Sequence, residues 1–465
     1  MAITKILEQC QVSAPPGSVP STSLPLTYFD ISWLHCHPIQ RLFFFNYPHP
    51  THHFLDTLLP TLKHSLSLTL QHFFPFAGNL LLPPNPLHIH PYILYNDGDS
   101  LPFTAAESSA DFTRLVSDSP TDVTELHHLV PPLPSPSNLE NGSRLISLMT
   151  IQVTIFPNSG LAIGVTFNHV AGDGRAFHHF MKFWASVCRA RGNSGSLLSS
   201  QPLPCHTRDI IKDPKGLKLI YLKERTKMEL AGPVTGVSFD KFRATFLLNQ
   251  DQIQKLKNWV SFTCFGNNTG STPHISTFVL TCSLMWVCMI KSEESQDSNF
   301  ANSLGEPCNL IFLADCRNHN PEFTIPPTYF GNCLAASIVA LKRGLLVGED
   351  GFVEAVKAME SKVRERKSDP LRGAETLFSN VRKLRMSGQP FLVIAGSPRF
   401  GVYETDFGWG KPRKSEVVHI DSSASISLSD GRDSEVAIEI GVALRRTQMN
   451  SLADILQKQL KNITG

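Results

Sequence analysis

The sequence predicts an α/β protein of mixed-sheet, α+β character that is divided into two domains. The chain has 465 residues, which is more than one hydrophobic core usually supports. Helix-like and strand-like segments alternate irregularly, without the strict strand–helix repeat of an all-parallel sheet. Residues 192–223 lose regular periodicity and contain three prolines. A loop of this length is unusual inside one compact domain, so we expect it to cross from a first domain at 1–191 to a second at 224–465.

Composition and charge exclude several classes of protein. Hydrophobic residues make up 42% of the chain and charged residues 18%, which suits a large core and excludes disorder. The net charge is +2 and no basic run occurs, so nucleic acid is not an expected partner. No secretory leader and no apolar run of ~18 residues are apparent. We therefore expect a cytoplasmic protein, without a membrane partner, whose ten cysteines are free thiols.

Periodicity places the main elements of the first half. Leucines at helical spacing predict a helix over 51–74, which Pro75 ends. Residues 11–27, rich in proline and serine, are predicted to form an extended arm. Two apolar runs at 148–156 and 161–167, joined by the turn-forming linker PNSG, predict a pair of strands. A helix is expected to follow at 175–189.

The second half uses the same kinds of segment. We expect helices and strands in the ranges 242–248 (strand), 251–262, 275–290 and 351–366 (helices), 391–395, 416–420 and 436–442 (strands), and 451–461 (helix). Strands and helices again mix without a fixed order, which agrees with the predicted fold class.

The chemistry-bearing segment is the loop HVAGDG at 169–174, directly after the apolar strand 161–167. A buried strand followed by a polar loop and a helix holds side chains rigidly at a cleft. The His169 imidazole has an ordinary pKa of ~6.5, so it suits a general base near neutral pH. Asp173 stands where a carboxylate caps the next helix. The alternative interpretation is a hydrogen-bonded loop histidine without chemistry.

Other interpretations of this spacing find less support. The pattern H-x-x-x-D also occurs from His52 to Asp56, where no buried strand precedes it, and we interpret that copy as an exposed helix start. One histidine–aspartate pair lacks the third ligand of a metal site, so no metal is expected. A serine hydrolase would carry a G-x-S-x-G turn, and the sequence has none.

Three motifs in order resemble the plant BAHD acyltransferases, and the resemblance covers essentially the whole chain. They are HVAGDG at 169–174, YFGNC at 329–333 and DFGWGKP at 406–412. The segments LPLTYFD at 24–30 and AGSP at 395–398 add to them. The YFGNC version resembles the branch that acts on flavonoid, anthocyanin and other phenolic glycosides.

The resemblance implies two similarly sized domains of the CoA-dependent acyltransferase type, with a solvent channel between them. It implies an acyltransferase of class EC 2.3.1, which moves a malonyl or hydroxycinnamoyl group from CoA to a sugar hydroxyl. His169 would act as base in a ternary complex without an acyl-enzyme. Acyl-CoA and a phenolic glycoside are the expected partners of a monomer that holds no permanent cofactor. The alternatives are a non-glycosylated alcohol acceptor, or a non-catalytic binding protein of the same fold.

The resemblance also implies roles for supporting residues. Asp173 would be structural and would pair with Arg317. In the late motif, Asp406, Gly408 and Gly410 are expected to form a tight turn. Trp409 would be either a packed anchor or a donor to the developing oxyanion.

Binding of the donor leaves several candidates. Ser276 and Thr277, at a predicted helix start, and Lys257 are candidates for CoA, because a helix N-terminus favours an anion. Arg175 and Lys182, seven residues apart on one helical face, are candidates for a malonyl carboxylate. A hydroxycinnamoyl donor would need an aromatic pocket instead. The sequence leaves this choice open.

Overall fold

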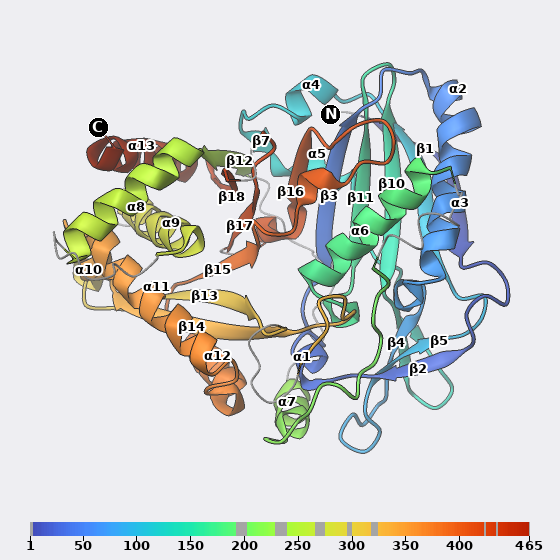
Figure 1. The fold of residues 1–465 in the computed structure, drawn as a ribbon, viewed down its shortest axis with the longest axis horizontal. Coiled ribbons are helices and arrows are strands. Elements are labelled where there is room, and N and C mark those ends of the chain that lie inside the picture. Colours follow the sequence, from blue (N-terminus) through green and yellow to red (C-terminus); the bar gives the residue numbers. More distant parts are fainter. Residues whose placement is uncertain are drawn as a thin grey trace.

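The computed structural model describes residues 3–191, 202–227, 240–265, 275–294, 300–317, 324–422, 425–433 and 436–464. It contains three mixed or antiparallel sheets with helices packed against them (Figure 1). The predicted mixed α/β fold class is therefore confirmed. No helix in these ranges combines the length and the apolar composition that crossing a bilayer requires.

The first sheet holds the strand that leads to His169. Its strands, in spatial order, are β1 (Thr4–Ser13), β6 (Ser100–Ser108), β10 (Met149–Phe156), β11 (Gly160–Phe167), β3 (Ile39–Asn46) and β16 (Lys414–Val417). β10 and β11 pair antiparallel from Met149↔Phe167 to Phe156↔Gly160, as the turn-forming linker predicted. Every residue of both strands is buried, which explains their continuous apolar sequence.

Two further sheets complete the β structure. The larger one contains, in spatial order, β14 (Leu334–Lys342), β13 (Pro307–Asp315), β15 (Phe391–Gly396), β17 (Ser425–Asp430), β18 (Ile438–Arg445), β12 (Lys241–Leu248) and β7 (Thr121–Asp122). The smaller one contains β2 (Thr22–Pro25), β5 (Tyr92–Tyr95), β4 (Asn79–Leu82), β9 (Arg144–Ser147) and β8 (Ser137–Asn138).

The helices divide between the two large sheets (Figure 1). In the half that carries β11 they are α1 (Tyr28–Ile31), α2 (Thr51–His53), α3 (Leu59–Leu70), α4 (Phe112–Leu115), α5 (Val123–His127), α6 (Gly174–Arg189) and α7 (Leu217–Arg225). In the other half they are α8 (Gln250–Phe265), α9 (Thr277–Glu293), α10 (Arg343–Val347), α11 (Gly351–Ser368), α12 (Leu377–Met386) and α13 (Arg446–Thr464).

The two halves exchange strands. β16 comes from the C-terminal half of the chain but pairs with β3, from Lys414↔Phe44 to Val417↔Arg41. In return, β7 comes from the N-terminal half and pairs with β12. The division at 192–223 stays a prediction, and part of that segment lies outside the described residues. Its described end is not loop throughout, because α7 forms there and buries Leu217 and Leu222 in the first core.

Two other sequence predictions need correction. The arm predicted at 11–27 is extended, but it belongs to the sheets: β1 ends at Ser13, and β2 pairs with β5. The strand predicted at 416–420 ends at Val417, and a tight helical turn follows over Val418–Ser422. In both places the extent of the strand depends on pairing with segments that are distant in the sequence. Local periodicity carries no information about such partners.

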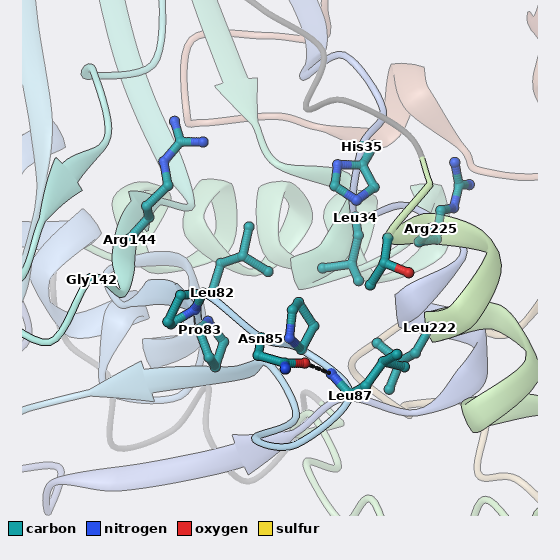
Figure 2. A pocket seen from close by; sticks show the side chains of 13 residues that line it. Leu34, His35, Leu82, Pro83, Asn85, Leu87, Gly142, Arg144, Leu222 and Arg225 are labelled. Carbon is teal, nitrogen blue, oxygen red and sulfur yellow. Dashed lines mark hydrogen bonds between the residues drawn. The ribbon is translucent and has the colours of Figure 1, made fainter.

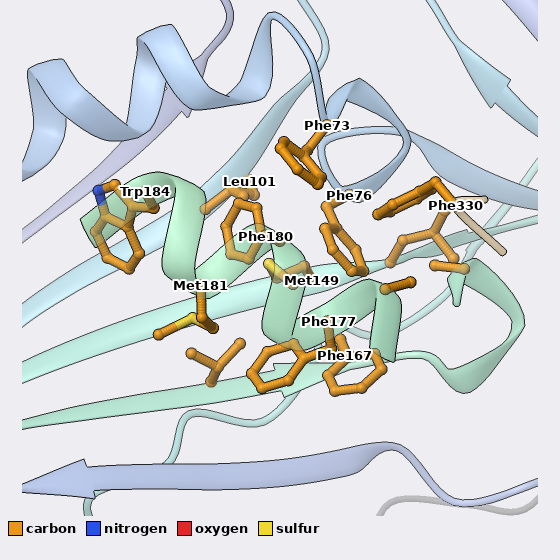
Figure 3. Packing of buried hydrophobic residues seen from close by; sticks show 14 of the residues in the cluster. Phe73, Phe76, Leu101, Met149, Phe167, Phe177, Phe180, Met181, Trp184 and Phe330 are labelled. Atoms are coloured by element: carbon orange, nitrogen blue, oxygen red, sulfur yellow. The ribbon is translucent and has the colours of Figure 1, made fainter. Parts of the chain in front are cut away.

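Aromatic packing fixes α6 on the first sheet. Phe177 of α6 stacks on Phe167 at the end of β11, with ring centroids 4.7 Å apart. Figure 3 shows Phe180 and Trp184 continuing the row along the helix, with Phe73 and Phe76 beside it. Each fully buried side chain of this size contributes about 1.5–3 kcal/mol. The strand end and the helix start on either side of His169 are therefore held by one apolar cluster.

Candidate active site

His169 lies in a short helical turn between the two packed elements. β11 ends at Phe167, and the side chain of Asn168 then accepts a hydrogen bond from Val170 N, which starts the turn His169–Ala171. Asp173 begins α6 and accepts from Ala176 N at 3.0 Å. The predicted capping role of this carboxylate is present. The loop is thus clamped at both ends by side-chain hydrogen bonds.

Asn332, from the other half of the chain, orients the His169 ring. Its amide nitrogen donates to His169 O at 2.8 Å and to the carboxylate of Asp30 at 3.0 Å. Both partners are pure acceptors, so they fix which way the amide points. The amide oxygen lies 3.0 Å from His169 Nδ1 and must accept a proton there. His169 is therefore held in the tautomer whose Nε2 carries the free lone pair.

Trp33 covers one face of the same imidazole. The two ring centroids are 3.6 Å apart and the planes differ by 4°. Burial lowers the pKa of His169 below its usual value, while Asp173, Asn332 and Asp30 act in the opposite direction. The ring is consequently neutral near pH 7, as a base must be. An aromatic face also attracts the imidazolium that forms when the base takes a proton.

Asp173 forms the ion pair with Arg317 that the resemblance implied. The shortest distance between them is 2.9 Å, and both side chains are almost wholly buried. The same carboxylate accepts from Cys333 N at 3.0 Å, while Arg317 also donates to Gly331 O. The pair therefore joins the histidine loop to the 331–333 segment. The hydrogen bonds of the Asp173 carboxylate are made to Arg317 and to backbone N–H groups, which is a structural role.

Close packing at Gly331 completes this junction. A β-carbon at Gly331 would lie 1.8 Å from Arg208 Nη1, and φ is +155°, so only glycine fits. Arg208 donates to Tyr329 Oη at 2.7 Å and lies 3.6 Å from Asp30. The backbone of the YFGNC segment thus has a structural part, while the Asn332 side chain contacts His169 directly.

Trp409 lies toward the far end of β11 from the histidine loop, which argues against the oxyanion-donor alternative. Its ring packs on Phe45, with centroids 6.0 Å apart, and Phe45 pairs with Leu161 at the start of β11. From Leu161 the strand runs six residues to its opposite end at Phe167, which is ~20 Å at ~3.3 Å per residue, and His169 follows that end.

The length of α6 also separates the late motif from the histidine loop. Gly408, the residue before Trp409, packs beside Arg189 at the end of α6, whereas Asp173 caps the start of that helix. A helix of 16 residues is ~24 Å long. The late motif and the histidine loop thus lie at opposite ends of the same two elements.

The late motif forms the tight turn that the sequence predicted. Asp406 Oδ1 accepts from Gly408 N at 2.8 Å and from Gly410 N at 3.0 Å. Both glycines have φ of +110°, a region that side chains disfavour. Trp409 stacks on Phe407, which in turn packs edge-on against Trp184 of α6. Trp409 is therefore the packed anchor of the two alternatives.

The CoA candidates lie on the two helices α8 and α9. The Ser276 hydroxyl caps α9 by accepting from Val279 N at 3.2 Å, so its oxygen already satisfies the helix. Thr277 begins the helix, and Lys257 is a partly buried residue of α8. Phe278 packs against Phe312 of β13, the strand that leads to Arg317. Their role in binding CoA stays a prediction.

The two candidates for a malonyl carboxylate are already paired. Arg175 lies 3.2 Å from Asp315, and Lys182 lies 2.5 Å from Glu404. All four side chains are partly exposed, so neither pair contributes much stability. Seven residues of helix separate the cations by ~10 Å along its axis. Only Arg175, two residues after Asp173, is near the histidine loop.

Sequence reasoning missed three residues that shape the site. Asp30 and Asn332 belong to segments that carried the resemblance, but a buried amide or carboxylate has no periodic signal of its own. Trp33 follows α1 in a loop and stands outside every recognised motif. The sequence offers one signal for them, which is the charged Asp30 in an apolar helix start. A buried charge requires a polar partner, so this residue could have been expected to bind another part of the chain.

Comparison with known proteins agrees with this geometry. A family model described as "Transferase family" matches residues 1–458. A coumaroyl-CoA:anthocyanidin 3-O-glucoside-6''-O-coumaroyltransferase of Arabidopsis thaliana is 42% identical over 98% of this chain and 97% of its own length. A malonyl-coenzyme:anthocyanin 5-O-glucoside-6'''-O-malonyltransferase of Salvia splendens is 36% identical over 99% and 96%.

Among solved structures, vinorine synthase covers 98% of both chains with a TM-score of 0.71 at 18% identity, which supports the fold. The family match and the identities over nearly full length go further than fold. Together with the three motifs, they show that the chain belongs to the BAHD acyltransferases of this transferase family.

Proposed function

We propose that the protein transfers an acyl group from CoA to a sugar hydroxyl of a phenolic glycoside, with His169 as general base. The observation that carries the proposal is the fixed tautomer of His169. Its Nδ1 proton is committed to the Asn332 oxygen, so Nε2 is available to a substrate hydroxyl. A ring held in this way loses no orientational freedom when it reacts.

The reaction needs two proton transfers and no acyl-enzyme. The acceptor hydroxyl gives its proton to Nε2 while its oxygen attacks the thioester carbonyl carbon. The tetrahedral intermediate then expels the CoA thiolate, which takes the proton back from the imidazolium. General-base help of this kind contributes ~10²–10⁴-fold in rate. Trp33, stacked on the ring, supports the cationic form between the two transfers.

For the donor, we propose a hydroxycinnamoyl group in preference to a malonyl group. Arg175 and Lys182 already face carboxylates of the chain itself, and a malonyl carboxylate would compete with them. The Arabidopsis relative that is 42% identical is named for coumaroyl transfer, and the Salvia relative at 36% for malonyl transfer. Both observations favour the aromatic donor.

The test is CoA release from a panel of acyl-CoAs, with and without anthocyanin and flavonol glucosides. Release only with both substrates supports the transferase, and faster release from coumaroyl-CoA than from malonyl-CoA supports the donor. Release without acceptor would indicate a hydrolase, and no release would indicate a binding protein. A non-glycosylated alcohol that matched the glucosides would contradict the proposed acceptor class.

Two further expectations accompany this function. We propose that the protein acts as a monomer in the cytoplasm, as expected from the resemblance. Sedimentation at micromolar concentration and imaging of a fluorescent fusion would test both. A dimer, or a fusion confined to a membrane compartment, would contradict them.

A further inference from the structure

A pocket of about 440 Å³ opens beside the loop that carries Trp33 (Figure 2). Its walls come from the 34–35 loop, the proline-rich segment 82–87, the turn before β9 and the C-terminal end of α7. The volume falls within the ~300–1,000 Å³ of typical small-molecule sites. Seven of its lining residues are proline or leucine, so its walls are mainly apolar.

The pocket shares a wall with the catalytic histidine's surroundings. Trp33 stacks on His169, and the next two residues, Leu34 and His35, line the pocket. Arg225 of α7 also lines it and donates to Ser32 O. α7 therefore holds the loop in place from the pocket side. A ligand in this pocket would lie on the opposite side of the Trp33 loop from the histidine turn.

The polar groups of the pocket suit neutral hydroxyls. His35 Nδ1 is buried and has no hydrogen-bond partner among the described residues. Burial lowers the pKa of His35 to about 4, so the ring is neutral near pH 7 and can bond a hydroxyl. Arg144 is partly exposed and forms no ion pair with any residue in the described ranges. Figure 2 shows Arg144 and Arg225 on opposite sides of the pocket.

We infer that this pocket binds the aromatic aglycone of the glycoside acceptor, with phenolic oxygens directed to His35 and Arg144; the inference rests on the proposed function. Flat rings match apolar walls, and phenolic oxygens are good acceptors for a guanidinium. The attached sugar would then pass the Trp33 loop toward His169.

The test narrows the pocket without touching the catalytic residues. Leu87 lines the pocket and is 40% exposed, so Leu87→Trp fills space there without disturbing the core. Leu247→Trp, at a 49% exposed position of β12, is the matched control. The measurement is kcat/KM for a flavonol 3-O-glucoside relative to methyl β-glucoside. We expect Leu87→Trp to lower this ratio roughly tenfold, the effect of about 1.4 kcal/mol, and the control to preserve it.

A second measurement separates failure of the pocket from failure of the proposed function. Free flavonol aglycone should bind the unsubstituted protein in equilibrium dialysis, and Leu87→Trp should weaken that binding by a similar factor. An unchanged ratio, or equal aglycone binding by all three proteins, would overturn the inference even if transfer is observed. If the unsubstituted protein transfers no acyl group, the proposed function fails, and the dialysis result alone decides the pocket.

Discussion

Two tryptophans show how differently two regions of this molecule are built. Trp33 and Trp409 are both partly exposed, and neither indole N–H has a hydrogen-bond partner within the described ranges. Trp33 lies flat on the His169 ring. Trp409 packs against Phe45 and Phe407 at the far end of β11 and α6. The conspicuous motif is therefore remote from His169, and the inconspicuous loop residue lies against it.

The two regions differ in how strongly the backbone restricts the amino acids that can occupy them. Gly408 and Gly410 occupy backbone conformations that side chains disfavour, and Asp406 ties the turn together. Such a turn permits few sequences, so it is recognisable. Trp33 needs only a flat ring over an imidazole, which leaves its neighbours free to vary. A distinctive motif thus indicates that the backbone permits few residues at those positions. Whether the motif also takes part in the reaction depends on its distance from the site.

The largest expected effect on activity is that of His169→Ala. Removing the base should lower kcat by ~10²–10⁴-fold, while the melting temperature should fall less than in Asp173→Ala, which leaves a buried charge unpaired. Steady-state CoA release and thermal unfolding of the same preparation measure both. A variant that keeps full turnover would show that the fixed tautomer has no catalytic meaning.

Asp173→Ala should act on stability more than on rate. Arg317 would stay buried without its partner, which costs ~3–5 kcal/mol, and α6 would lose its cap. Urea unfolding of this variant beside His169→Ala measures the contrast. Equal midpoints for the two variants would contradict the division into one chemical and one structural residue.

The fold and the histidine loop could be predicted because their signals are local. The hairpin of β10 and β11 follows from two apolar runs and a turn linker, and α6 from its period and cap. β16 could not be placed on β3, because that pairing joins residues 370 or more positions apart. The contact between Asn332 and His169 likewise joins two halves of the chain. Long-range partners of this kind leave no trace in the periodicity of one sequence.

Asn332→Ala tests the hydrogen bond that orients His169 by removing its acceptor. The imidazole would lose the acceptor that fixes its tautomer. Asp30 would lose the side-chain amide donor at 3.0 Å and keep the backbone N–H of residue 332. An unsatisfied buried group costs ~1–3 kcal/mol, so we expect a loss of stability in that range together with a lower kcat. If Asn332→Ala lowered stability but left kcat unchanged, the role of Asn332 would be structural only.

The pH dependence of kcat/KM is the next smaller effect. Burial lowers the pKa of His169 from its ordinary ~6.5, and only the neutral ring accepts a proton. The midpoint of the acid limb of the profile should therefore lie below pH 6.5. An initial-rate series in constant-ionic-strength buffers measures it. A limb centred above 6.5 would mean that the ring is exposed or faces a carboxylate.

The smallest effects come from the tryptophans themselves, and they test the comparison most directly. Trp33→Phe keeps an aromatic face over His169 but weakens its attraction for imidazolium. At ~0.5–1 kcal/mol for such contacts, kcat/KM should fall by up to ~5-fold. Trp409→Phe retains the packing on Phe45 and removes an N–H that lies ~20 Å from the histidine, so turnover should not change. If Trp409→Phe slowed the reaction while Trp33→Phe did not, the assignment of these two regions would be reversed, because rate would then follow the turn at the end of α6 and not the ring stacked on the base.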